Sequence, residues 1–167
     1  SDAEGGTLLV KAVIVEEGIT GIGENAFSEM ARLETVSLPS PLRVIAYKGF
    51  ASCRNLHTVT GGNGLTTIEA SAFRDCNQLY TEYEYGTYVG NAQNPYAVLI
   101  GLTNKNQTTY NIHKDTQIIA YDVFSGCTKL TEITIPDSVT TIGNYAFYGC
   151  SGLTGVTIGN GVTTIGD

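Results

Sequence analysis

Apolar side chains recur along this chain at a fixed interval. Leucines stand at Leu33, Leu56 and Leu79, and again at Leu130 and Leu153. The step between neighbouring copies is 23 residues, except between Leu79 and Leu130, where 28 further residues intervene. A phenylalanine lies six positions before each leucine, at Phe27, Phe50, Phe73, Phe124 and Phe147. A constant period in this range is typical of a solenoid, in which each repeat forms one coil and stacks on the next.

The pattern inside one repeat predicts short elements. In the most regular copy, residues 131–153, apolar and polar residues alternate over 132–135, which favours a strand with one buried face. Asp137-Ser138 predicts a turn, and residues 139–142 a second extended stretch. Apolar spacing of three and four over 146–153 predicts a short helical or 3₁₀ turn. One coil cannot bury its apolar residues alone, so neighbouring coils must share a continuous core.

The repeat Leu-x-x-Ile-x-Ile-Pro-x-x-Val-x-x-Ile-Gly-x-x-Ala-Phe-x-x-Cys resembles the BspA-type leucine-rich repeat of bacterial surface proteins. The resemblance covers residues 10–167 apart from the inserted segment. It implies an α/β repeat fold, a right-handed curved solenoid with short strands on one face and short helical or 3₁₀ turns on the other. We therefore predict one leucine-rich-repeat domain over 1–167, with repeats beginning at 10, 34, 57, 108 and 131 and a partial one at 154.

The inserted segment, residues 80–108, interrupts the period. Strand-like pieces at 80–85, 87–89 and 96–102 are separated by turn signals, which predicts a β-hairpin or meander. Six of the ten tyrosines fall between positions 80 and 110, so this is where the chain concentrates aromatic side chains. In one interpretation they pack against the solenoid, and in the other Tyr83, Tyr85 and Tyr88, with Tyr96 as a further candidate, form an exposed platform for a glycan or peptide. We favour packing, because clustered tyrosines usually cover other residues.

The strand face is the second candidate binding surface. The predicted register places six residues in its central column: Ile14, Ser37, Thr60, Asn111, Thr134 and Thr157. Glu132 lies in the flanking column. This surface is small, polar and mostly uncharged, and it lacks the aromatic cluster that dominates tight interfaces. We expect modest affinity that many repeats or many copies would strengthen. In the alternative interpretation these threonines are only solvent-facing strand formers.

The four cysteines, Cys53, Cys76, Cys127 and Cys150, occupy one repeat position, which holds Met30 in the first copy. A position that accepts methionine indicates soft apolar volume, so we predict free, buried thiols. A disulfide between neighbouring coils stays open as an alternative, although its geometry requires Cα atoms within about 7 Å. Residues 21–26 fit a dinucleotide fingerprint, yet 142–146 fill the same repeat positions, so we predict no cofactor and no metal. Neither His57 nor His113 has a nucleophile at a defined spacing, and we predict no enzymatic activity.

The composition of the chain disfavours several classes of binding partner. The net charge of −7 disfavours binding to nucleic acid or to an anionic membrane. No apolar run is long enough to span a bilayer, so we predict no direct membrane insertion. The resemblance implies an extracellular or cell-surface location, and we interpret the chain as a mature fragment of a longer exported protein.

These observations predict a non-catalytic adhesion-type module that binds a host or bacterial surface protein or glycan. The alternative is a structural spacer or stalk in a larger surface protein. The last coil stops before its Ala-Phe-x-x-Cys segment and lacks a polar cap. We expect that coil to be frayed or to be covered by another copy of the chain, in end-to-end self-association.

Overall fold

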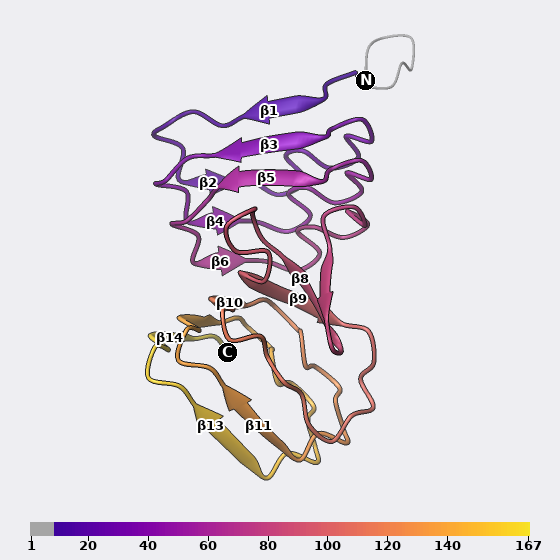
Figure 1. Ribbon diagram of the computed structural model, residues 1–167, viewed down its shortest axis with the longest axis vertical. Coiled ribbons are helices and arrows are strands. Elements are labelled where there is room, and N and C mark those ends of the chain that lie inside the picture. The colour runs from indigo at the N-terminus through magenta and orange to yellow at the C-terminus, as the bar shows by residue number, and fades with distance from the viewer. Residues whose placement is uncertain (1–8) are drawn as a thin grey trace. The chain divides into compact units, whose positions relative to one another are not determined.

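The computed structural model describes residues 9–167, which form two compact units whose boundary, between Tyr80 and Thr81, coincides with the start of the predicted insertion. In the first unit, three strands build a parallel front sheet (Figure 1): β1 (Ala12–Ile14), β3 (Thr35–Leu38) and β5 (Thr58–Gly61). Three shorter strands build a second parallel sheet: β2 (Gly21–Ile22), β4 (Val44–Ile45) and β6 (Thr67–Ile68). Each coil therefore contributes one strand to each sheet.

Strand register confirms that one repeat makes one coil. Ala12 pairs with Thr35 and Thr35 with Thr58, so equivalent residues of successive repeats lie side by side. The phenylalanine rings follow the same rule within each unit. Phe27 stacks on Phe50 at 5.1 Å between ring centroids, and Phe50 on Phe73 at 5.6 Å. In the second unit Phe124 stacks on Phe147 at 5.1 Å with an interplanar angle of 1°.

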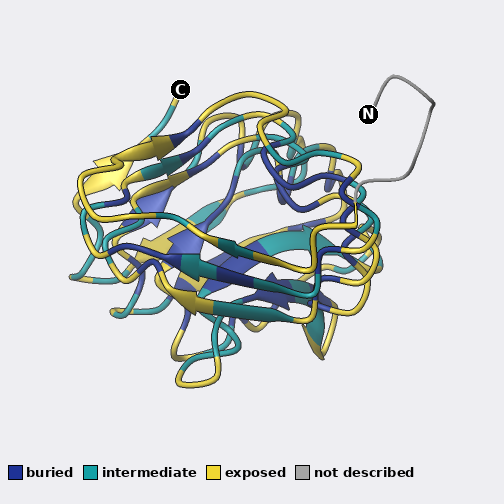
Figure 2. Cartoon of the chain, turned by 90° about the horizontal axis from the view of Figure 1, so that it is seen from above, coloured by how far each residue is buried: buried dark blue, intermediate teal, exposed yellow. Residues whose placement is uncertain are grey.

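The apolar repeat positions form the core of each unit (dark blue in Figure 2). Leu33, Leu56 and Leu130 are completely buried, and so are Phe50 and Phe124 to within 1%. Burying a side chain of this size stabilises the fold by roughly 1.5–3 kcal/mol. The buried leucines and phenylalanines of the repeat therefore contribute to cohesion between coils, together with the isoleucines, valines and cysteines of the same core.

The prediction of helical or 3₁₀ turns opposite the strands is wrong, because residues 9–167 contain no helix. The segment around each phenylalanine forms successive turns instead. Two residues in each of these segments, two positions before and two after the phenylalanine, have positive φ, as at Asn25 (55°) and Glu29 (63°). Left-handed residues interrupt a right-handed helix. They also point alternate N–H groups at the next coil: the Phe27 N–H donates to the Gly49 carbonyl at 2.8 Å, not to its own chain four residues back.

The second unit combines coils with the insertion. Its larger sheet has the order β14-β12-β10-β9-β8-β7. Three strands come from coils: β10 (Ile118–Ile119), β12 (Thr141–Ile142) and β14 (Thr164–Ile165). The other three form an antiparallel meander, as predicted: β7 (Thr81–Tyr83), β8 (Gly86–Val89) and β9 (Val98–Leu102). Because β9 pairs in parallel with β10, the insertion extends the sheet of the coils.

The front sheet of this unit has two strands, β11 (Glu132–Ile135) and β13 (Gly155–Ile158), in parallel register. The fourth repeat departs from prediction here, because residues 109–112 form no strand. The residue just before them still contacts the next coil, because the Thr131 N–H donates to the Thr108 carbonyl at 2.9 Å.

All four cysteines are free, as predicted, with Cys150 half-buried and the other three buried. Their thiols do more than fill volume. The Cys76 Sγ donates to the Phe50 carbonyl at 3.0 Å, and the Cys53 and Cys150 thiols contact the Phe27 and Phe124 carbonyls at 3.1 Å. The neighbouring Cys53 thiol and burial raise the pKa of the Cys76 thiol. The repeated cysteine thus supplies a weak hydrogen bond between coils as well as apolar contact.

The last coil is not frayed, since β13 pairs with β11 over four residues and β14 pairs with β12. Its apolar side chains are nevertheless bare: Val156, Ile158 and Ile165 are 43%, 47% and 60% exposed. The expectation that the last coil is frayed is therefore wrong.

Candidate binding surfaces

The front sheet of the first unit carries two of the predicted site residues. Ser37 and Thr60 are in register on β3 and β5, below Ile14 of β1. Thr60 is exposed and Ser37 is half-buried. Ile14 is 73% exposed, so an apolar side chain heads an otherwise polar column. The surface offers hydroxyl groups and one aliphatic contact to a partner.

The front sheet of the second unit carries three more. Thr134 and Thr157 are paired on β11 and β13, and Glu132 lies opposite Gly155. All three predicted residues are exposed. Because Gly155 has no side chain, the Glu132 carboxylate stands beside an open backbone. This face can accept and donate hydrogen bonds but has a single charge.

Threonines off this face have a structural role that the sequence did not predict. The Thr131 hydroxyl donates to the Thr108 carbonyl at 3.2 Å, and Thr154 to Thr131 at 3.1 Å, always one repeat back. Thr140 and Thr163 form the same ladder beside β12 and β14. Their hydroxyls hold coils together, so a threonine column alone does not indicate a binding site.

Asn111 does not join the central column, because it lies outside any strand. Its Nδ2 donates to both carboxylate oxygens of Glu84, at 3.2 and 3.0 Å. Glu84 belongs to the turn between β7 and β8 and has a φ of 49°. The meander therefore recruits this side chain, which the repeat pattern had placed on the sheet face.

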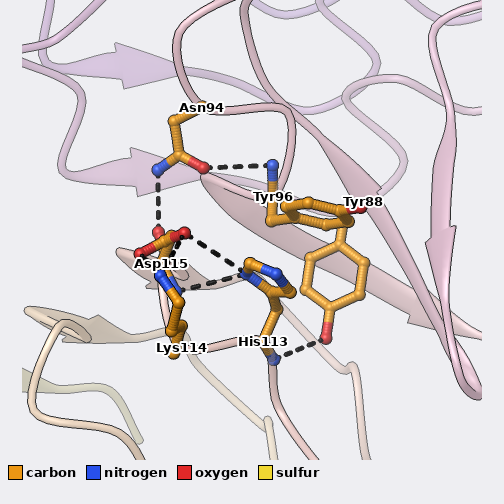
Figure 3. A network of polar contacts seen from close by, with 6 residues as sticks. All are labelled: Tyr88, Asn94, Tyr96, His113, Lys114 and Asp115. Atoms are coloured by element: carbon orange, nitrogen blue, oxygen red, sulfur yellow. Dashed lines mark hydrogen bonds and ion pairs between the residues drawn. The ribbon is translucent and has the colours of Figure 1, made fainter.

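The tyrosines of the meander pack, as favoured, and form no open platform. Tyr88 is 1% exposed, and its hydroxyl accepts the backbone N–H of His113 at 3.2 Å (Figure 3). Burial raises the pKa of Tyr88. Tyr96 stacks on the His113 ring at 3.7 Å, and Tyr83 meets both rings edge-on. These four rings form one cluster, in which Tyr88 is buried and the other three residues are half-buried.

Polar contacts clasp the meander to the fourth repeat around this cluster (Figure 3). The Asn94 Nδ2 donates to the Asp115 carbonyl at 2.7 Å, and its Oδ1 accepts the Tyr96 N–H at 3.1 Å. The Asp115 N–H donates to His113 Nδ1 at 3.3 Å, and Lys114 pairs with the Asp115 carboxylate. The imidazole is an acceptor in this arrangement, with no nucleophile beside it in the clasp.

Tyr85 is the predicted tyrosine that remains exposed. Its ring meets that of Tyr110 edge-on, with 6.4 Å between centroids. Tyr110 is buried and was not among the predicted site residues. Desolvation and the Cys127 thiol raise the pKa of Tyr110 to about 12. A single exposed ring is a weaker docking element than the predicted platform.

A third surface was missed by sequence reasoning. Tyr145 and Tyr148 flank Phe147 and are 46% and 69% exposed. Their rings lie 6.0 Å apart at 83°, and Tyr121 meets Tyr145 at 5.5 Å. They adjoin a cavity of about 320 Å³ in the second unit. A comparison of the repeats could have found this surface, since no other copy has an aromatic residue at either of the two positions.

Stacked parallel strands, one phenylalanine per coil and a 23-residue register define a leucine-rich-repeat β-solenoid. The chain belongs to the BspA type leucine rich repeat region, whose six copies match residues 6–84 and 102–167. The unmatched residues between the two ranges, 85–101, belong to the meander, where the coil pattern is absent. No curated protein matches the chain.

Solved structures of leucine-rich-repeat proteins are similar to this chain. A leucine rich cell surface protein from Faecalibacterium prausnitzii A2-165 matches with 25% identity and a TM-score of 0.50, over 92% of this chain and 43% of that one. A leucine-rich repeat protein from Bacteroides ovatus ATCC 8483 matches with 25% identity and a TM-score of 0.46, over 94% and 45%. The T. pallidum leucine-rich repeat protein TpLRR matches with 23% identity and a TM-score of 0.46, over 93% and 69%. The chain thus spans less than half of the first two. Over residues 9–167, no helix could cross a membrane.

Proposed function

We propose that this chain is a non-catalytic, adhesion-type binding module of an extracellular or cell-surface protein, and that it contacts a surface protein or glycan through its front sheets. The observation that supports this most directly is the exposed row formed by Glu132, Thr134 and Thr157 on two strands in register. Family membership and the similarity to a cell surface protein support the location. A flat polar face favours weak contacts that repetition strengthens.

The test measures binding of the protein to a panel of immobilised matrix proteins and glycans. A front variant combines Thr134→Arg with Thr157→Arg, which places two bulky cations on the sheet. A matched control combines Thr128→Arg with Ser151→Arg, exposed residues one repeat apart in the turns that follow the phenylalanines. We expect the front variant to lose at least about tenfold in affinity, which corresponds to 1.4 kcal/mol. Equal binding by both variants would move the site away from the sheet.

Tyr85→Ala addresses the meander. Because β9 continues the sheet of the coils, deleting the insertion would uncover buried residues, and a point change is the cleaner test. If Tyr85→Ala loses binding and the front variant does not, the contact lies at the turn between β7 and β8.

The second candidate function is a spacer that holds other domains away from a surface. The packing of Tyr83, Tyr88 and Tyr96 around His113 favours it, because the buried Tyr88 and the half-buried Tyr83 and Tyr96 then serve the fold. The spacer would be supported if the unmodified protein bound no matrix protein or glycan of the panel, even when many copies of it were attached to one bead.

A further inference from the structure

The two cysteines of the first unit, Cys53 and Cys76, lie in neighbouring coils at the same repeat position. The Ser52 N–H, directly before Cys53, donates to the Arg74 carbonyl of the next coil at 2.6 Å. Backbones that are hydrogen-bonded in this way lie about 4.8 Å apart. A disulfide needs Cα atoms between about 4.4 and 6.8 Å apart. The spacing of the coils at this turn therefore suits a covalent link between them.

The two thiols point in the same direction along the stack. Cys53 Sγ donates to the Phe27 carbonyl at 3.1 Å and Cys76 Sγ to the Phe50 carbonyl at 3.0 Å, in each case 26 residues back. The Cys76 thiol therefore reaches into the coil that holds Cys53. A hydrogen bond between the two thiols lowers the pKa of Cys53 and raises the pKa of Cys76. The two sulfurs thus meet inside the first unit.

We propose that Cys53 and Cys76 form a redox-active dithiol, which a small-molecule disulfide oxidises to a covalent link between the second and third coils. The Cys53 thiolate attacks one sulfur of the small disulfide, and the other half leaves as a thiolate. Cys76 then loses its proton and attacks the Cys53 sulfur of this mixed disulfide, which expels the second half. The protein gives up two electrons and two protons, and the small disulfide becomes two thiols.

The surroundings of the two thiols assign the order of these steps. The thiolate is the reactive form of cysteine, so Cys53, with its lowered pKa, attacks first and Cys76 resolves the mixed disulfide. Both thiols are 0% exposed, so the reagent reaches them when their turn opens locally. Cys53 is followed by the exposed residues Arg54 and Asn55, which place this turn at the surface.

The second unit supplies an internal comparison. Cys127 and Cys150 also lie one repeat apart. The Cys127 thiol contacts the Tyr110 hydroxyl at 3.7 Å, and burial raises the pKa of Cys150. These contacts favour the protonated form of Cys150 and give Cys127 a partner other than a thiol. We therefore expect this pair to oxidise more slowly.

The proposed dithiol does not depend on the front sheets, and it stands if they bind nothing. An extracellular location would supply an oxidising environment, but the chemistry needs only a small disulfide. The two proposals can therefore fail separately.

The test treats the reduced, folded protein with 2-hydroxyethyl disulfide, a small neutral reagent. Samples are quenched in acid, the remaining thiols are alkylated after unfolding, and unreduced peptides are identified by mass spectrometry. We expect a peptide pair linked through Cys53 and Cys76 to form before any link between Cys127 and Cys150. A larger thiolate population outweighs the weaker nucleophilicity of a more acidic thiol.

The link should also change the dynamics of the turn. Hydrogen exchange of the Ser52 N–H should slow by at least about tenfold in the linked protein, because the two coils can no longer separate there. Dithiothreitol should restore the original exchange rate.

Three variants separate the roles of the two sulfurs. Cys76→Ser keeps a hydrogen-bond donor beside Cys53 and removes the resolving sulfur, so the mixed disulfide should accumulate on Cys53. Cys53→Ser should leave Cys76 unmodified over the same time. The control combines Cys127→Ser with Cys150→Ser and should form the link at the rate of the unmodified protein.

The unmodified protein decides the outcome even if a variant fails to fold. The proposal is overturned if the link between Cys127 and Cys150 forms first, or if oxidation stops at mixed disulfides. It is also overturned if the folded protein forms no link under conditions in which the urea-unfolded protein does.

Discussion

At the scale of the residue, Tyr110 shows how one hydroxyl fastens the loop after the meander. The Tyr110 O–H donates to the Asn104 carbonyl at 2.8 Å and lies 3.7 Å from Cys127 Sγ. Its ring packs on Phe124 with 5.4 Å between centroids, in line with the phenylalanine stack of the second unit. The repeat pattern did not predict this role, because Tyr110 occupies a strand position in the regular copies.

We expect Tyr110→Phe to destabilise the protein at pH 7 by about 1 kcal/mol, because it removes the hydrogen bond and keeps the ring. The raised pKa of about 12 makes this difference depend on pH. A phenol whose pKa is higher folded than unfolded stabilises the fold below about pH 10, and that contribution is lost as the pH rises from 10 towards 12. Urea unfolding at pH 7, 10 and 11.5 should therefore show the gap between parent and variant shrinking. A constant gap would contradict the assigned burial, and Tyr85→Phe is the exposed control.

At the scale of the element, the turn around each phenylalanine replaces the helix that apolar spacing had predicted. Spacing of three and four reports which side chains face the core. It does not report where the backbone N–H groups go, and here alternate groups bond to the next coil. The second left-handed residue is Glu29, Ser52 or Asp75 in the first unit, and Gly126 or Gly149 in the second. Only the two glycines hinted at the conformation in advance.

We expect Gly126→Ala to destabilise the second unit by about 1–2 kcal/mol, because its φ of 73° is unfavourable for a residue with a Cβ. No atom lies within 4 Å of the added Cβ, so the cost comes from the backbone alone. Gly101→Ala in β9 is the matched control, with the same empty surroundings and no positive φ. Its effect should stay within about 0.5 kcal/mol. Equal unfolding free energies for the two variants would argue against backbone strain.

At the scale of the whole molecule, repetition gives every described coil open strand edges unless a neighbour covers them. In the second unit the last coil leaves three aliphatic side chains bare. A strand that lies between two neighbours, such as β3 between β1 and β5, has both edges paired. Cohesion therefore comes from the stacking of coils and not from any single coil.

The 23-residue period by itself determined the coils, the phenylalanine stacks and the strand register outside residues 109–112, because in a stack each apolar position meets its own equivalent one repeat away. Met30 at the cysteine position favoured free thiols over a disulfide, and the structure has free thiols. The period also located the meander within the insertion, since residues 80–108 break that period with turn residues. Only the tertiary structure decided that Asn111 leaves the sheet for Glu84, that Tyr88 is sealed while Tyr85 is exposed, and that Tyr145 and Tyr148 adjoin a cavity. Those outcomes depend on which partner takes a hydrogen bond or a ring face, and hydrophobic periodicity records burial without recording partners.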